Sequence, residues 1–141
     1  MAGYSGTPLP QKLGIKAGHV LCSLNAPDNW RDTLGALPAD CKAIDLTKSK
    51  LPIDVCVAFA TTLEQLHDHF KRVHPRLAPT GGLWIAWPKK TSGLATELNE
   101  NLIRNIGLAT GLVDNKVCAI DEIWSGLRFV IRLKDRPQPR R

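Results

Sequence analysis

Residues 54–60 read DVCVAFA, an almost unbroken apolar run of strand length that follows Pro52. Two further stretches have the same character: HVLCSL at residues 19–24 and LWIAW at residues 83–87. A strand with one solvent-exposed face alternates apolar and polar residues, whereas a continuous apolar run is typical of a strand covered on both faces. The three runs therefore predict neighbouring strands of a parallel sheet.

Helical patterns separate these runs. Thr61 and Glu64 form a capping-box pattern ahead of apolar residues at helical spacing, and Pro75 ends that helix. Thr91 or Ser92 is expected to cap a long helix, because leucine or isoleucine recurs at every fourth residue from 94 to 106. The shorter elements expected are helices at residues 8–13 and 29–34, the second capped by Asp28, and a strand at residues 42–46.

Two strands are expected near the end of the chain, at residues 116–124 and 127–133, with a tight turn at Ser125-Gly126. Leu127, Phe129 and Ile131 alternate with other residues, as in a strand with one apolar face. Crossovers between parallel strands are right-handed, which limits the topology. The pattern predicts an α/β fold: a three-layer, doubly wound, mostly parallel sheet of about six strands that ends in an antiparallel hairpin.

The composition fits one folded domain. The chain has 141 residues, of which 43% are hydrophobic and 23% are charged, close to the averages of globular domains. The formal net charge is +6, but residues 134–141 hold four cations against one acid and so carry half of that excess. We expect a single α/β domain at residues 1–133 and a flexible basic tail at residues 134–141.

The cysteines and the first residues bear on location. Cysteines at positions 22, 41, 56 and 118 form no close pair, and a zinc site needs closely spaced ligands. We expect reduced core cysteines and no metal site. No secretory pattern is visible at the start, and no apolar run approaches the roughly 20 residues of a membrane span. A cytoplasmic protein without membrane contact is expected.

Five segments resemble, in order, strands of the class I methyltransferases. They are HVLCSL (19–24), KAIDL (42–46), IDVCVAFA (53–60), LAPTGGLWIAW (77–87) and VCAIDEIWSGLRFVIR (117–132). The second includes an acidic residue, Asp45, about 20 positions after the first strand, as in nucleotide-binding sheets. One helix–strand unit of that family is missing between Leu46 and Asp54.

A narrower resemblance covers residues 4–133. PLPQKLGI (8–15), GGLWIAWPKK (81–90) and DEIWSGLRFV (121–130) are similar to the uncharacterised bacterial domain-of-unknown-function family 3052. This resemblance implies a methyltransferase-like, Rossmann-like fold with no assigned activity.

The turn after the first strand departs from the methyltransferases that the chain resembles. Their first strand leads into a glycine-rich turn, which lets the backbone approach the cofactor. Residues 25–29 read NAPDN, with no glycine, and Pro27 removes a backbone donor. The sequence therefore disfavours S-adenosylmethionine as a cofactor.

A ligand of such a sheet binds beyond the carboxyl ends of the strands. The candidate ligand-binding residues at that edge are Asn25, Asp28, Asp45, Trp87, Lys89, Lys90, Thr91, Ser92 and Trp124. Within this set, residues 87–93 combine two cations and two hydroxyls ahead of the expected helix, which favours an anion. The plainer alternatives stay open: a hydroxyl that only caps the helix, and indoles that only pack.

Three functions follow, in order of preference. The first is a non-catalytic methyltransferase-like module that binds a small anion or a protein partner at the strand ends. The second is a divergent, methyltransferase-related enzyme with a rebuilt cofactor pocket. The third is weak nucleic-acid binding through the basic tail, which ranks lowest because the rest of the chain is nearly balanced in charge. No catalytic residue is assigned. The unpaired edges of the outer strands are compatible with a homo-oligomer.

Overall fold

The computed structural model describes residues 6–137. Six strands form one sheet in the order β2-β1-β3-β4-β6-β5. In chain order the elements are α1 (Leu9–Lys12), β1 (Val20–Leu24), α2 (Trp30–Leu34), β2 (Lys42–Ala43), β3 (Ile53–Phe59), α3 (Leu63–Val73), η1 (His74–Arg76), β4 (Leu77–Pro88), η2 (Lys90–Ser92), α4 (Glu100–Ala109), β5 (Leu112–Ala119), β6 (Trp124–Ile131) and η3 (Leu133–Asp135).

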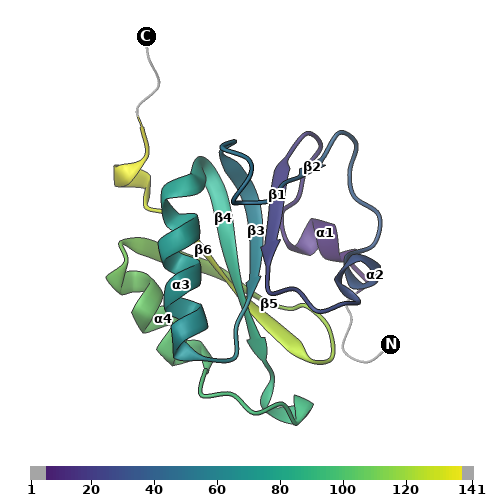
Figure 1. Cartoon of the computed structure of the whole chain (residues 1–141), viewed down its shortest axis with the longest axis vertical. Helices are drawn as coiled ribbons and strands as arrows, with labels where there is room; N and C mark the ends of the chain where they lie inside the picture. Colours follow the sequence, from purple (N-terminus) through teal and green to yellow (C-terminus); the bar gives the residue numbers. More distant parts are fainter. Residues whose placement is uncertain (1–5, 138–141) are drawn as a thin grey trace.

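The sheet has a parallel half and an antiparallel half. Strands β2, β1, β3 and β4 run parallel, while β6 runs antiparallel to both β4 and β5. Helices α3 and α4 lie on one side of the sheet and α1 and α2 on the other (Figure 1). This confirms the predicted α/β fold, with a mostly parallel sheet that ends in an antiparallel hairpin.

The two faces of the sheet carry separate cores. Leu66, Phe70 and Ile103 from α3 and α4 pack with one set of strand residues. On the other face, Leu13 packs with Trp84, whose indole N–H donates to the carbonyl of Leu13 at 3.0 Å. That face is covered only by short helices, α1 with 4 residues and α2 with 5. It is therefore the thinner layer and leaves room for cavities.

The long helix begins later than the sequence predicted. Its first residue is Glu100, and its N-cap is Asn99, whose side chain accepts the N–H of Leu102 at 2.9 Å. Thr91 and Ser92 do not cap it, so that expectation is wrong. Gly93 has φ +79° and stops the preceding 3₁₀ turn, which is why the fourfold leucine spacing does not produce a helix there.

The closing hairpin turns earlier than expected. The chain reverses at residues 120–123, between β5 and β6, and Ser125 and Gly126 lie inside β6. The carboxylate of Asp121 holds the turn by accepting the N–H groups of Ile123 and Trp124, both at 2.8 Å. The predicted turn at Ser125-Gly126 is wrong because an Asx-type bond forms the reversal.

Two helix caps lie one residue beyond the expected ones. Thr62, not Thr61, caps α3 and forms the capping box with Gln65. Asn29, not Asp28, is the N-cap of α2, and it makes no side-chain capping bond. Both helices therefore begin within one residue of the predicted start.

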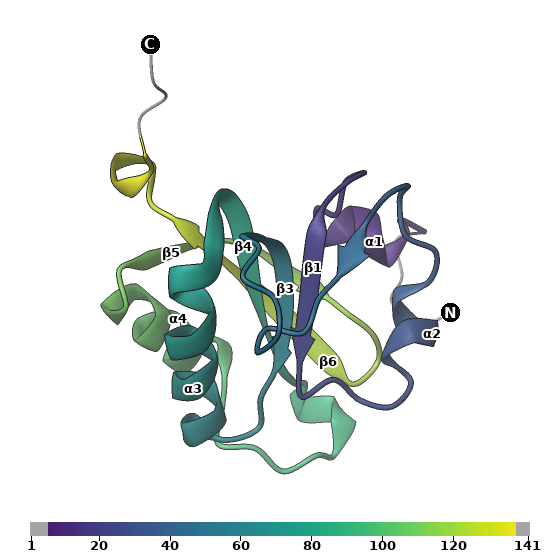
Figure 2. The ribbon, with the colours of Figure 1, turned by 45° about the horizontal axis from the view of Figure 1, so that its top comes forward.

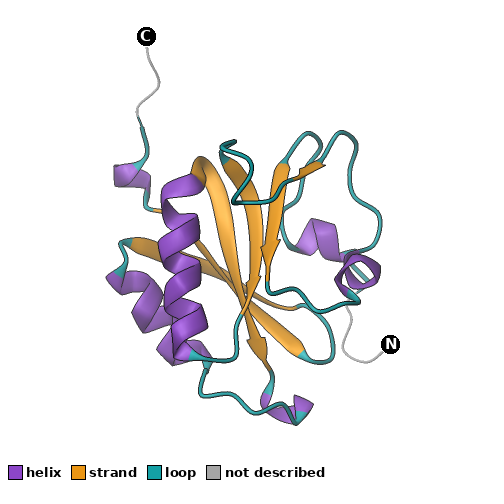
Figure 3. Ribbon diagram, in the orientation of Figure 1, coloured by secondary structure: helices purple, strands orange, loops and turns teal. Residues whose placement is uncertain are grey.

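Strand β2 is shorter than predicted. It pairs only with Val20 and Leu21 of β1, and the chain then passes across β1 on its way to β3 (Figure 2). Figure 3 shows loop rather than helix along this connection. The Arg76 guanidinium holds the connection by donating to the carbonyls of Leu46 and Ser49. On the side of β1 away from β3, no strand within residues 6–137 pairs with Cys22–Leu24, and this side is the open edge of β1.

The start of the predicted tail is described, and its end is not. Residues 133–135 form a 3₁₀ turn, and the Nε of Arg136 donates to the carbonyl of Ile131 at 3.1 Å. Residues 138–141 lie outside the described residues, so the flexible tail stays a prediction, as do the single domain and the cytoplasmic location. Within residues 6–137, no helix is long and apolar enough to cross a membrane.

Candidate functional site

A cavity of about 420 Å³ lies along the open edge of β1. Its walls are the end of β1, the chain that follows β2, and one side chain of α3. The lining residues are Ser23, Leu24, Asn25, Ala43, Ile44, Asp45, Leu46 and Arg72. The structure therefore brings together two of the predicted site residues, Asn25 and Asp45.

Asn25 makes the turn that follows β1. Its φ is +54°, in the left-handed region that glycine enters freely and that asparagine tolerates better than most residues. Its side-chain amide donates to the carbonyl of Phe59 at 3.4 Å, which ties the turn to the end of β3. The chain thus makes at residue 25, without a glycine, a backbone conformation that usually favours one.

Asp45 presents an ionised carboxylate to the cavity. One of its oxygens, Oδ1, accepts the N–H of Thr47 at 2.8 Å and the hydroxyl of Thr47 at 2.6 Å. These hydrogen bonds, the hydroxyl's first, lower the pKa of Asp45 below its ordinary value. The side chain is therefore charged at neutral pH and can accept hydrogen bonds from hydroxyl groups of a ligand.

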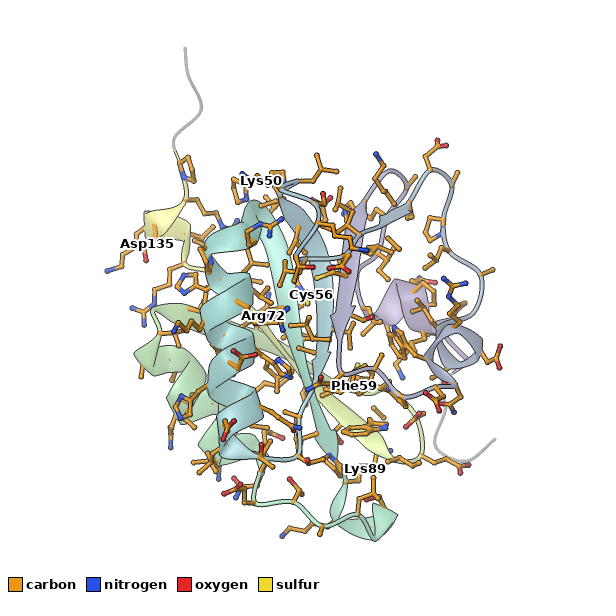
Figure 4. All side chains as sticks on the ribbon, in the orientation of Figure 1. Lys50, Cys56, Phe59, Arg72, Lys89 and Asp135 are labelled. Atoms are coloured by element: carbon orange, nitrogen blue, oxygen red, sulfur yellow. The ribbon has the colours of Figure 1, made fainter. Side chains whose placement is uncertain are left out.

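Arg72 is the cation of this cavity, and the sequence did not single it out. It lies on α3 beside Cys56 of β3, far from Lys89 at the other end of β4 (Figure 4). Its guanidinium pairs with Asp68 one turn away on α3, at 3.6 Å between Nη1 and Oδ2. Both side chains of that pair are more than a third exposed, so the pair is weak and leaves Arg72 able to bind an anion.

A buried histidine of α3, His69, contacts the end of β3 close to Asn25. It is 1% exposed, and its Nε2 lies 2.7 Å from the carbonyl of Phe59, the same oxygen that Asn25 approaches. Burial lowers the pKa of His69, so the ring is neutral with its proton on Nε2. The sequence feature that predicts this burial is the position of His69 between Leu66 and Phe70, on the apolar face of α3.

The two candidate tryptophans lie on opposite faces of the sheet. Trp87 is 7% exposed and packs in the core beneath α3 and α4. Trp124 is half-buried on the α1 and α2 side, with its ring centroid 5.0 Å from that of Phe59 in an edge-to-face contact. Trp30 of α2 meets the same phenyl ring at 5.1 Å. The indoles therefore do not line one pocket.

The turn that follows β4 lies apart from the β1 cavity. Lys89 donates its N–H to the carbonyl of Ile123 at 2.7 Å, and the Ser92 hydroxyl donates to the carbonyl of Lys89, also at 2.7 Å. Neither they nor Lys90 and Thr91 line the cavity, and the helix expected to begin here is absent. Asp28, in the exposed turn before α2, does not line it either.

Metal ligands do not gather in the part of the chain that the structure describes. Residues 6–137 contain no group of three or more histidine, cysteine or acidic side chains placed to hold a metal ion. Cys22 and Cys56 lie opposite each other on β1 and β3, both buried and both with free thiols.

Solved structures of methyltransferases share this fold. The TehB-like S-adenosylmethionine-dependent methyltransferase of Corynebacterium glutamicum has 10% identity and a TM-score of 0.56, over 93% of this chain and 91% of that one. The N-methyltransferase NodS of Bradyrhizobium japonicum has 12% identity and a TM-score of 0.56, over 86% and 90%. Aeropyrum pernix fibrillarin, with natively bound S-adenosyl-L-methionine, has 15% identity and a TM-score of 0.54, over 91% and 70%.

At these identities the likeness shows the fold, which is that of the class I S-adenosylmethionine-dependent methyltransferases. No family model matches the chain, and no curated protein matches it. The resemblance to family 3052 therefore stays a prediction.

The prediction that disfavoured S-adenosylmethionine is contradicted. Proteins with this fold are named for that cofactor or hold it, so the fold points toward it. The prediction rested on the missing glycine and on Pro27, yet the backbone at Asn25 takes a φ of +54°, in the region that glycine usually supplies.

Proposed function

We propose that this chain binds an adenosyl cofactor, S-adenosylmethionine or its demethylated product, in the cavity along the open edge of β1. The observation that carries the proposal is the joint placement of Asn25 and Asp45 on one cavity of about 420 Å³. In nucleotide-binding sheets, the turn after the first strand approaches the phosphates of the ligand, and an acid about 20 residues further on accepts hydrogen bonds from its ribose.

Each group has a distinct role in the proposal. Asp45, held ionised by Thr47, accepts hydrogen bonds from the ribose hydroxyls. The Arg72 guanidinium pairs with the carboxylate of the amino-acid part of the cofactor. The left-handed turn at Asn25 brings backbone close to the ligand, and the contact with the Phe59 carbonyl holds that turn in place.

The chemistry of the bound cofactor sets the class of activity. S-adenosylmethionine supplies an electrophilic methyl group, so a chain that binds it belongs with the divergent, methyltransferase-related enzymes expected from the sequence. The binding of a small anion or a protein partner at the carboxyl ends of the strands stays a separate prediction, as does the binding of nucleic acid by the tail.

Isothermal titration of the wild-type chain with S-adenosylhomocysteine tests the proposal. We expect saturable binding, and about a tenfold loss of affinity or more in Asp45→Ala, because hydrogen bonds to a charged group are worth about 1.5–3 kcal/mol. Asp32→Ala is the matched control, since Asp32 is an exposed acid on α2 that does not line the cavity.

Two results would overturn the proposal. The first is no heat of binding for the wild-type chain at millimolar ligand. The second is the same affinity in Asp45→Ala and Asp32→Ala, which would place the ligand elsewhere. Arg72→Gln provides an independent test. It should lower the affinity for S-adenosylhomocysteine but leave the affinity for adenosine unchanged, because adenosine has no carboxylate.

A further inference from the structure

A second cavity, of about 250 Å³, lies at the opposite end of the parallel strands. It sits where β1, β3 and β4 begin, on the side of the sheet that α1 covers. The lining residues are Lys12, Leu13, Gly14, Lys16, His19, Asp54, Thr80, Trp84, Lys116 and Arg128. It shares none of them with the β1-edge cavity.

Positive charge dominates this amino-end cavity. Its walls carry three lysines and one arginine against a single carboxylate, that of Asp54. Asp54 already uses one oxygen, because its Oδ2 accepts the N–H of Val20 at 2.8 Å. Among residues 6–137, the ion pairs within 4.0 Å involve none of Lys16, Lys116 and Arg128. The cavity therefore holds a surplus of positive charge that its own residues do not neutralise.

Arg128 is the most constrained of these cations. Its guanidinium lies directly over Gly82, where a Cβ would overlap it. The Nε atom is buried and, within the described residues, has no hydrogen-bond partner. Burial, followed by the charge of Arg136, lowers the pKa of Arg128. Burial without a partner is costly for a charged donor group, so an anion in the cavity that Arg128 lines would be bound favourably by its guanidinium.

The walls of the cavity are fixed in place. The ammonium group of Lys12 donates to the carbonyl of Ala119 at 2.9 Å, and that of Lys116 donates to the carbonyl of Lys12 at 3.2 Å. These bonds tie the end of α1 to β5, so the cations are positioned before any ligand arrives. The Lys116 ammonium has three donors, so this one bond leaves it able to donate to a ligand as well.

His19 adds a donor. Its Nδ1 accepts the N–H of Lys16 at 3.1 Å, which leaves Nε2 as the donor of the ring. The hydroxyl of Thr80 is a further donor on the wall.

We propose that the amino-end cavity binds a compact polyanion, the phosphate or diphosphate group of a small ester. Several cations and neutral donors that surround one small volume match a tetrahedral group with several charged oxygens, whereas a single carboxylate would leave most of them unpaired. The volume is below the roughly 300–1,000 Å³ of pockets that enclose drug-sized ligands, so only the ionic head enters.

The site is separate from the proposed adenosyl site, and the two can fail independently. Ligands of open α/β sheets bind beyond the carboxyl ends of the strands. This cavity lies at the amino ends and is built from α1 and the β5–β6 hairpin, together with the first residues of the parallel strands.

An NMR titration of the full chain with pyrophosphate tests the proposal. With ionic strength held constant, we expect saturable changes at the amides of Gly14, His19 and Thr80 and none at Asn25 or Asp45. Arg128→Gln should weaken binding about tenfold or more, as expected when a charge-assisted bond is lost. Lys71→Gln, an equal change of charge at an exposed position on α3, should leave the affinity unchanged.

Lys116→Gln keeps the test decisive if Arg128→Gln does not fold. Lys116 is exposed on an outer strand, and its replacement should lower the affinity for pyrophosphate about twofold to fivefold. Unsaturable changes, changes at other amides, or equal weakening by Lys71→Gln would overturn the proposal. The proposal would also be overturned if a single-stranded oligonucleotide, but not pyrophosphate, shifted the resonances of these amides, since the ligand would then be nucleic acid.

Discussion

Replacing Phe59 with leucine should destabilise the protein through the loss of two aromatic contacts. The Phe59 ring is 1% exposed and meets Trp30 edge-to-face at 5.1 Å and Trp124 at 5.0 Å. An aromatic pair of this geometry is worth about 0.5–1.5 kcal/mol beyond the area it buries. Phe59→Leu keeps the site apolar but loses both pairs, so the free energy of unfolding should fall by about 1–3 kcal/mol.

Urea unfolding followed by circular dichroism measures this loss, with Phe70→Leu as the control. Phe70 is as deeply buried but, among the described residues, makes a single edge-to-face contact, with Phe129 at 5.0 Å. Its replacement should therefore cost about half as much. If Phe59→Leu were no more destabilising than Phe70→Leu, the account of Phe59 as the residue that joins α2 to the closing hairpin would be refuted.

Two other substitutions test the packing around the sheet. His69→Gln should flatten the pH dependence of stability. The pKa of His69 is lower in the folded chain than its ordinary 6.5. The wild type is therefore most stable above pH 6.5 and loses stability as the pH falls below that value. Urea midpoints that decline equally in both proteins between pH 7 and pH 5 would contradict this. Gly107→Ala should cost about 1 kcal/mol, because overpacking against the Phe129 ring outweighs the helix preference of alanine; an unchanged or raised urea midpoint would show that the ring moves aside.

The parallel half of the fold followed directly from the sequence. Continuous apolar runs have few alternatives to a strand covered on both faces, and all three runs became neighbouring strands. The boundaries that failed depend on tertiary contacts. Leu94 continues the helical spacing, yet it is 49% exposed and lies outside α4. The hydroxyl of Thr96 instead donates to the carbonyl of Thr61 at 2.7 Å and holds this segment against the start of α3.

Gly126 was predicted to form a turn, and the structure gives it a different role. Beside Ser125 it resembled a hairpin turn, but it lies within β6, where a Cβ would come within 3.0 Å of the Trp84 ring. Its role is therefore close packing of a tryptophan against the strand, a requirement that the local sequence does not reveal.

The candidate site was predictable only in part. Asn25 and Asp45 follow consecutive strands, so the rule for strand ends was enough to bring them together. Arg72 comes from a helix far along the chain, and no local pattern links it to the other two. The amino-end cavity was invisible for the same reason, because Lys16, Lys116 and Arg128 meet only after the sheet has formed.

A crystal structure of the wild-type chain grown with S-adenosylhomocysteine would test the adenosyl site most directly. We expect the nucleoside along the open edge of β1, with its ribose hydroxyls within hydrogen-bond distance of Asp45. A crystal saturated with the ligand that shows this edge empty, or shows the nucleoside bound elsewhere on the sheet, would contradict it.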